Sequence, residues 1–238
     1  MKTFFKVVLF VFVSVFYSCG KDENASSADS SITSTGVLSG TIVNYNSSLI
    51  DSLKADYYTS KDFIGKCRVA SDGKFSLNLS IPVLEKIGNV EGLDISDTTA
   101  LTASLELNGY LKDVKVGEIM KSNYTTDSLN KVGMCSALMV YVDRPITMKG
   151  ETSDSESYNG LVETYSSKVD LILKKGWNEI TNTVNIYSKT KTNINTTVIL
   201  SNNIGKDLQW IFIQSNFQNG RSNVRSLQLK KSRRFFFN

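Results

Sequence analysis

Apolar and polar residues alternate with a period of two through much of the chain that follows Gly36. A period of two is typical of a β-strand with one buried face, because successive side chains on a strand point to opposite faces. Stretches of this kind, or short apolar runs of strand length, occur at 37–44, 51–58, 63–70, 75–79, 101–107, 114–120, 134–142, 161–173, 182–187, 196–200, 208–213 and 224–229. The sequence therefore predicts an all-β fold, with at most one short helix, between Pro82 and Asp97.

Residues 36–82 contain a recognisable set of segments. Ser39 to Val43 form an opening strand, a middle strand ends near Val69, and the sequence Asp72-Gly73-Lys74-Phe75 supplies a tight turn ahead of Pro82. This run resembles the carboxypeptidase-regulatory-like, transthyretin-like β-sandwich of Bacteroidota surface proteins. The resemblance implies an Ig-like/transthyretin-like β-sandwich that serves as an accessory or display module without catalytic residues.

The sequence Asp143-Arg144-Pro145 interrupts the strand pattern, which restarts after it. We expect one β-sandwich over residues 36–143, and over residues 144–238 either a second sandwich in tandem or an extension of the first. Within the second part, residues 151–159 are polar and acidic and predict a loop. The sequence Lys174-Lys175-Gly176-Trp177-Asn178 resembles a hairpin common in Bacteroidota lipoproteins.

The first eighteen residues have the features of an export signal. Lys2 and Lys6 precede or border an apolar stretch at 7–16, and small Ser18 directly precedes Cys19. An apolar core of this length is typical of a secretory signal rather than of a membrane span. The stretch resembles a bacterial lipoprotein signal, which implies that residues 1–18 are removed and that the Cys19 thiol receives a lipid anchor. A single acyl chain holds a protein only marginally, and the resemblance implies three.

The residues behind the cysteine predict an address. Lys21, Asp22 and Glu23 resemble the short export tag with which Bacteroidota send lipoproteins to the outer face of the outer membrane. Residues 24–35 are rich in Ser, Ala, Asp and Thr, and with Cys19 to Glu23 they form a predicted flexible tether, 19–35. We expect an outer-membrane protein anchored by lipid and displayed on the cell surface, with the periplasmic face as the alternative.

Histidine is absent from the chain. This absence excludes Ser-His-Asp and Cys-His catalysis and His-based zinc hydrolysis. A hydrolase that uses two carboxylates remains open, but no pair among the 23 Asp and Glu residues is singled out. We predict no catalytic residues, no metal site and no cofactor. The net charge of +4 becomes +2 once Lys2 and Lys6 are removed with the signal, and this gives no electrostatic reason to expect nucleic acid as a partner.

Two cysteines remain once Cys19 is lipidated. Cys67 and Cys135 form a disulfide bond in one interpretation and are two separately buried thiols in the other. Two tryptophans likewise leave two alternatives open. Trp177 and Trp210 either stack on a sugar ligand or pack in the core of the sheet.

The chain ends in the basic residues 230–234 and three phenylalanines, 235–237. This end is interpreted either as an electrostatic clamp to an anionic lipid or polysaccharide or as a frayed terminus. Taken together, the sequence predicts a cell-envelope lipoprotein that acts as a non-catalytic binding, adhesion or display module for a glycan or protein ligand. The alternatives are a carboxylate-based surface glycan hydrolase and a purely structural envelope protein.

Overall fold

The computed structural model describes residues 32–33, 35–57, 63–123, 132–204 and 207–214. This part of the chain forms fourteen β-strands and no helix, so the predicted all-β class is confirmed. None of it forms a helix that could cross a membrane. The predicted signal peptide, Cys19, the residues Lys21 to Glu23 and the basic C-terminal residues lie outside the described residues.

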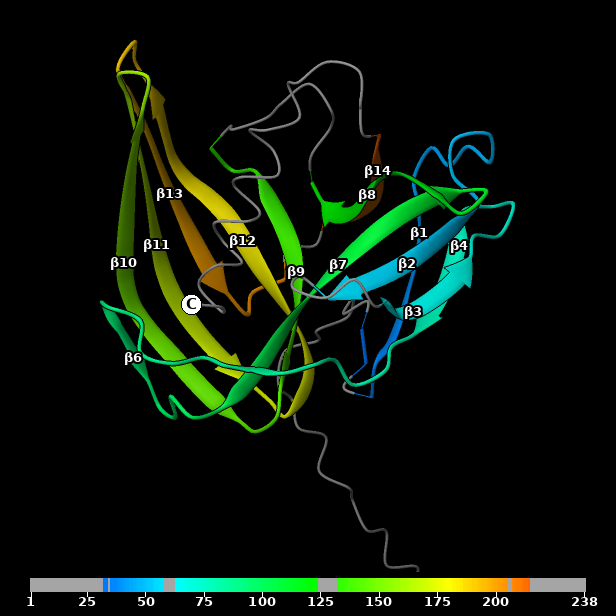
Figure 1. Cartoon of the computed structure of the whole chain (residues 1–238), viewed down its shortest axis with the longest axis horizontal. Coiled ribbons are helices and arrows are strands. Elements are labelled where there is room, and N and C mark those ends of the chain that lie inside the picture. The colour runs from blue at the N-terminus through cyan, green and yellow to red at the C-terminus, as the bar shows by residue number, and fades with distance from the viewer. Residues whose placement is uncertain (1–31, 34, 58–62, 124–131, 205–206, 215–238) are drawn as a thin grey trace, which may run out of the picture.

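Twelve strands form one large curved sheet (Figure 1). Along the sheet the order is β3 (Phe63–Arg68), β2 (Ser52–Tyr57), β7 (Leu101–Leu111), β8 (Val114–Ser122), β9 (Cys135–Val142), β12 (Gly176–Lys189), β13 (Asn193–Ser201), β11 (Leu161–Leu173), β10 (Ile146–Tyr158) and β6 (Leu93–Ile95). β14 (Gln209–Gln214) pairs with β8, and β5 (Glu85–Lys86) pairs with β7. The remaining strands, β1 (Val37–Thr41) and β4 (Lys74–Asn78), pair with each other as a second, small sheet. β11 and β13 run parallel to each other.

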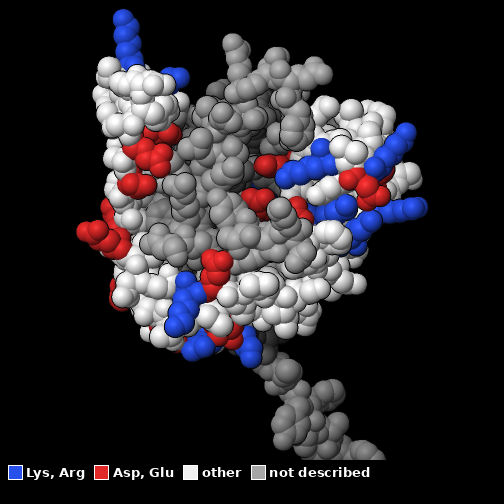
Figure 2. Space-filling view, viewed as in Figure 1, with Lys and Arg blue, Asp and Glu red and all other residues white. Residues whose placement is uncertain are grey.

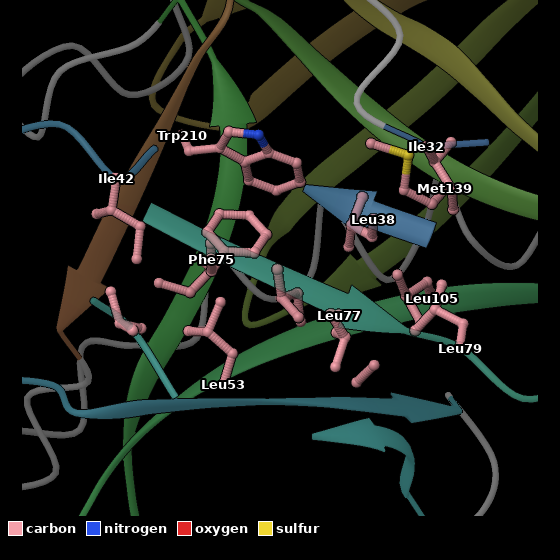
Figure 3. Packing of buried hydrophobic residues seen from close by; sticks show 14 of the residues in the cluster. Ile32, Leu38, Ile42, Leu53, Phe75, Leu77, Leu79, Leu105, Met139 and Trp210 are labelled. Carbon is pink, nitrogen blue, oxygen red and sulfur yellow. The ribbon is translucent and has the colours of Figure 1, made fainter. Parts of the chain in front are cut away.

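A first hydrophobic core lies where the small sheet packs on the large one (Figure 3). Leu38 and Leu77 from the small sheet meet Leu53 and Leu107 from the large sheet, and all four are buried. Phe75 and Trp210 lie edge to face, with ring centroids 5.3 Å apart. These contacts give the β1–β4 end of the molecule the two-layer arrangement of a β-sandwich.

A second core lies on one face of the other end of the large sheet. It combines buried residues of β9, β10, β11, β12 and β13 with residues of the segment 84–100, and its fully buried members include Met148, Leu171, Leu173, Ile180 and Leu200. We call the face of the sheet that carries this core the inner face. Ile87 and Ala100 of the segment 84–100 are buried in this core, and Leu84, Leu93 and Ile95 pack against it.

The predicted boundary at Asp143 does not separate two sheets. β9 ends at Val142 and pairs with β12, which begins at Gly176, so one sheet continues across the boundary. Trp177, from the second predicted part, belongs to the first core. One sheet therefore contains strands from both predicted parts.

One predicted loop is a strand in the structure. Residues 151–158, expected as a loop, belong to β10, which is paired with β11 along its whole length. Both residues at the end of this hairpin have a positive φ, Asn159 at 49° and Gly160 at 76°, and such a pair is typical of a tight hairpin turn. No helix forms between Pro82 and Asp97, where Gly88 and Gly92 take positive φ values of 71° and 83°.

The Asp72-Gly73 turn forms as expected, with Gly73 at a φ of 82°. It does not join two paired strands, however, because β3 pairs with β2 in the large sheet and β4 pairs with β1 in the small one. The turn therefore carries the chain from one layer to the other.

Candidate functional site

The two tryptophans proposed as sugar-stacking residues are both buried. Trp177 and Trp210 each have 6% of their surface exposed and belong to the first core. Trp177 packs edge to face with Tyr141 at 5.5 Å. Because a stacking residue must offer an open ring face to the sugar, the burial of both rings favours the core-packing alternative.

Cys67 and Cys135 are free thiols in the structure, which favours the alternative of two separate thiols. Cys67 is half-buried on β3 and Cys135 is buried on β9, two strands that are far apart in the sheet order. The Thr183 hydroxyl lies 3.2 Å from the Cys135 sulfur and donates a hydrogen bond to it. Burial raises the pKa of both thiols.

A small gap opens where β7, β8 and β9 part. β7 pairs with β9 through residues 102–104 and with β8 through residues 107–111, whereas β8 meets β9 at a single pair, Ser122 and Ser136. The three strands and Trp210 enclose a cavity of about 40 Å³. Its polar lining consists of Glu106, Asn108, Glu118 and Lys121.

Two polar contacts organise this gap. Lys121 donates a hydrogen bond from Nζ to Glu179 Oε1 at 2.8 Å, and both side chains are almost fully buried. Asn108 donates from Nδ2 to Asp56 Oδ2 at 2.5 Å. Burial raises the pKa of Asp56, although this hydrogen bond acts in the opposite direction. A space of this size has room for about three water molecules, so it is too small for a sugar ring.

A further set of polar side chains lies on the inner face beyond the second core, around a third buried cluster formed by Tyr165, Val184 and Val198. Side chains on a strand alternate between faces, so Ser167, Tyr165 and Glu163 of β11 lie on the same face as the core residues Val169 and Leu171. Neighbouring strands add further polar residues to this face: Thr152, Asp154 and Glu156 of β10, Thr196 of β13, and Asn182 and Tyr187 of β12. We call this set the polar inner face.

A β-bulge in β12 places Tyr187 on this face. The register between β12 and β13 shifts between Val184 and Ile186, so that Tyr187, rather than its neighbour, lies beside Thr196. Ile186 is exposed on the opposite, outer face of the sheet. Bulges redirect side chains in this way and are common next to functional sites.

The hydroxyl groups of the two faces differ in their pairing. On the outer face, Ser153 pairs with Ser166 at 2.9 Å and Ser155 with Thr164 at 3.0 Å. On the inner face, Ser167 is 0% exposed and Thr196 is 2% exposed, and neither hydroxyl has a hydrogen-bond partner among the described residues. A buried hydroxyl without a partner costs about 1–3 kcal/mol, so a polar atom within hydrogen-bond reach would stabilise each of these two groups.

The polar inner face also carries negative charge. Asp154, Glu156 and the almost fully buried Glu163 project from β10 and β11, and Lys189 lies on the same face toward the end of β12. The pKa of Tyr158, at the end of this hairpin, is raised first by burial and then by the charges of Glu163 and Glu156. Figure 2 shows acidic side chains gathered along the β10–β11 side of the molecule. The face therefore favours a ligand with positive charge.

Sequence reasoning did not identify this face. The stretch 151–159 was expected to be a loop, and the residues of β11, β12 and β13 come together only through pairings between distant strands. The available signal was Asn159-Gly160, which marks a hairpin and would have placed residues 151–158 on a strand. Among the described residues, no three His, Cys, Asp or Glu side chains are placed to hold a metal ion.

Comparisons of the chain with protein-family models, curated proteins and solved structures find no match.

Proposed function

We propose that this chain is an exported, lipid-anchored envelope protein that acts as a non-catalytic binding module and holds its ligand on the polar inner face. The observation that carries the proposal is the pair of buried, unpartnered hydroxyls of Ser167 and Thr196 beside Tyr165 and Glu163. A ligand that donates and accepts hydrogen bonds there offsets the cost of these groups.

The chemistry of the face favours a peptide or protein segment with basic and aromatic side chains. Carboxylates attract Lys or Arg and form charge-assisted hydrogen bonds with them. Tyr187, which is partly exposed and lies beside the same Thr196 as the buried Tyr165, offers aromatic surface to an apolar or aromatic side chain. Of the two ligand classes expected from the sequence, a glycan or a protein, the protein class fits this face better, since the two tryptophans are buried in the core.

The sequence supports the location. The lipoprotein-like signal, Cys19 and the Lys21-Asp22-Glu23 tag favour attachment to the outer membrane at the cell surface. Residues 20–31 would then link the acyl chains to the folded part. The folded part begins at Ile32, which is buried in the first core and bridges Leu38, so the predicted tether ends before residue 35. A binding module attached in this way can reach partners beyond the membrane surface.

The carboxylate-based hydrolase is a weaker candidate. Glu106 and Glu118 both line the gap between β7, β8 and β9, which is the arrangement that this alternative needs. The gap, at about 40 Å³, is far below the 300–1,000 Å³ that is usual for a small-molecule site. A sugar substrate does not fit between the two carboxylates.

Photo-crosslinking in cells tests the proposal. A photo-reactive phenylalanine analogue is placed either at Tyr187, on the polar inner face, or at the adjacent Ile186, on the outer face. We expect a discrete adduct with another molecule from position 187 and none from position 186, and we expect the adduct to disappear when Glu163→Gln is added. Equal adducts from both positions, or none from either, would contradict the proposed role of the face.

A further inference from the structure

β10 is the last long strand at one end of the large sheet, and it borders the polar inner face (Figure 1). One side of β10 pairs with β11 over residues 146–158. On the other side, β6 pairs with residues 148–150, and no described residue pairs with residues 152–158. At about 3.4 Å per residue, this leaves about 20 Å of strand with an open edge.

A turn ends the cover that β6 gives to β10. Leu93 pairs with Gly150, and the Leu93 N–H donates a hydrogen bond to the Val90 carbonyl at 3.1 Å, which closes the turn. Gly92 has a φ of 83° in this turn, a value that favours glycine, and a Cβ atom there would overlap the carbonyl oxygen of Glu151. β5, which precedes the turn, pairs with β7 instead. The edge of β10 is therefore left open beyond Glu151.

The open edge presents backbone hydrogen-bonding groups. Thr147 and Glu151 each form a backbone hydrogen bond of 3.0 Å with the segment 92–96. Backbone groups on a strand face its two neighbours alternately, so the odd-numbered residues of β10 face away from β11. Because the β10–β11 register has no shift, the N–H and C=O groups of the next odd-numbered residues face the open edge: Ser153, Ser155 and Ser157. Unpaired groups of this kind are a template for pairing with another strand.

The side chains along the open edge favour a basic neighbour. Asp154 and Glu156 lie on the inner face, and residues 152–158 contain no Lys or Arg. Glu156 lies directly opposite Glu163 of β11 in the register. Like charges directly opposite each other destabilise a pair of strands, so a Lys or Arg side chain on an added strand would reduce the repulsion between them.

The opposite end of the large sheet differs from the β10 edge. There the last strand is β3, and the Ser80 N–H donates a hydrogen bond of 2.8 Å to the Ile64 carbonyl. A Cβ atom on Gly65 would lie 2.7 Å from the Asn78 carbonyl oxygen. The chain that follows β4 therefore packs along β3, whereas residues 152–158 have no such neighbour among the described strands.

We propose that β10 binds a basic segment of another protein by strand addition. The segment pairs antiparallel with residues 152–158, as β6 does with residues 148–150, and places Lys or Arg beside Asp154 and Glu156. A second copy of β10 is a poorer occupant, since it would place acidic side chains beside acidic ones. This inference rests on the proposed role of the chain as a binding module and names the way in which it holds its ligand.

A fluorescent peptide of sequence Lys-Thr-Lys-Thr-Lys-Thr-Lys tests the strand addition, with anisotropy as the measure of its Kd for the intact chain. In the antiparallel pairing, lysines beside Asp154 and Glu156 turn their own N–H groups away from β10, and the threonines turn theirs toward it. N-methylation of the three threonine amides should raise the Kd by about tenfold or more. N-methylation of the last three lysine amides should leave the Kd unchanged. Equal effects of the two would indicate attraction by charge alone and would overturn the proposal.

Charge variants of the protein locate the bound peptide. Asp154→Asn combined with Glu156→Gln should weaken binding of the unmethylated peptide and reduce its dependence on salt. The matched control combines Asp72→Asn and Asp113→Asn, two exposed aspartates in the β3–β4 and β7–β8 connections. The control should leave the Kd unchanged. Equal losses in the two double variants would overturn the assignment to β10.

A proline variant tests the backbone of the edge. Ser155→Pro removes an N–H group that faces the open side and spares the hydrogen bonds to β11, whereas Ser155→Ala removes only the hydroxyl group. We expect the proline variant to weaken peptide binding by about tenfold and the alanine variant to leave it unchanged. Equal Kd values for the two variants would contradict strand addition. The methylated peptides keep the proposal testable if the proline variant does not fold, because they leave the protein unaltered.

The outcomes separate this inference from the proposed function. If the two methylated peptides bind equally while position 187 still crosslinks to another molecule, strand addition fails and binding at the polar inner face stands. If the peptides show the expected difference while position 187 gives no adduct, strand addition stands and the proposed role of the polar inner face fails.

Discussion

Lys121 and Glu179 form a buried ion pair across three strands, with Nζ and Oε1 2.8 Å apart and side-chain exposures of 6% and 0%. Lys121 lies on β8 and Glu179 on β12, and β9 separates these strands in the sheet. The pair therefore holds the large sheet together at the point where β8 leaves β9.

Breaking this pair is expected to destabilise the protein strongly. Either Lys121→Met or Glu179→Leu breaks this buried ion pair, which costs about 3–5 kcal/mol. The double variant removes both charges and is expected to recover most of that loss. Urea unfolding of the four proteins in a double-mutant cycle measures the coupling. Additive losses in the double variant would show that the pair is not coupled.

Gly40 is expected to tolerate no side chain. A Cβ atom at this position would overlap the indole ring of Trp210, and the ring edge of Phe75 lies 3.2 Å away. Overpacking of a core costs about 1–3 kcal/mol, so Gly40→Ala should lower the free energy of unfolding by that amount. Thermal unfolding monitored by tryptophan fluorescence measures the change. Ser39→Ala, on the exposed face of the same strand, is the control and should change little.

Two aspartates on the β2 side of the sheet are expected to shift stability with pH in opposite directions. The folded-state pKa of Asp51 is lowered, first by a hydrogen bond from the Lys112 backbone N–H and then by one from the Ser52 hydroxyl. Its contribution is present above the ordinary value of 3.8 and is lost as the pH falls through the lowered pKa. The folded-state pKa of Asp56 is raised by burial, so the folded state binds this proton more tightly than the unfolded state. The free energy of unfolding therefore declines as the pH rises from 3.8 through the raised pKa.

Denaturant unfolding between pH 3 and pH 8 checks both signs. Asp56→Asn should raise the free energy of unfolding more at neutral pH than at pH 3. Asp51→Asn should lower the free energy of unfolding more at neutral pH than at pH 3. The same trend in both variants would contradict the assignment of burial to Asp56 and of hydrogen bonding to Asp51.

The thiols of Cys67 and Cys135 are expected to react slowly in the native protein. Burial raises both pKa values above the ordinary 9.0, which reduces the reactive thiolate at neutral pH. Alkylation should therefore accelerate as the pH rises above 9 and on unfolding, with the half-buried Cys67 ahead of Cys135. Intact mass before and after alkylation of the unfolded, unreduced protein counts the free thiols. A mass that shows no alkylation without reductant would reveal a disulfide bond.

The sequence predicted a strand or turn well where the signal lies in adjacent residues. Alternation located β1 to β4, and Asp72-Gly73 marked a turn whose glycine has a φ of 82°. β10 was missed because Ser, Asp and Glu have low β-propensity. In the structure, cross-strand pairs such as Ser153 with Ser166 and Lys168 with Glu151 accompany its pairing with β11.

The candidate site depends on pairings that alternation does not reveal. β13 inserts between β11 and β12 and runs parallel to β11, so the turn at Lys174 to Asn178 does not join neighbouring strands. The turn is instead closed locally by the Asn178 side chain, which bonds the Lys174 backbone at both its N–H and its carbonyl. Register between distant strands decides which side chains share a face, and it brings Tyr165, Ser167 and Thr196 together. The same long-range packing buries Trp177 and Trp210.

A binding face at the cell envelope requires export and a membrane anchor, and both are predicted to depend on Cys19. Mass analysis of the N-terminal peptide of the protein from the membrane fraction tests this directly, with Cys19→Ser as the control. We predict a peptide that begins at a triacylated Cys19, and a Cys19→Ser protein that is not lipidated. A peptide that begins at Met1, or at an unmodified Cys19, would contradict the account.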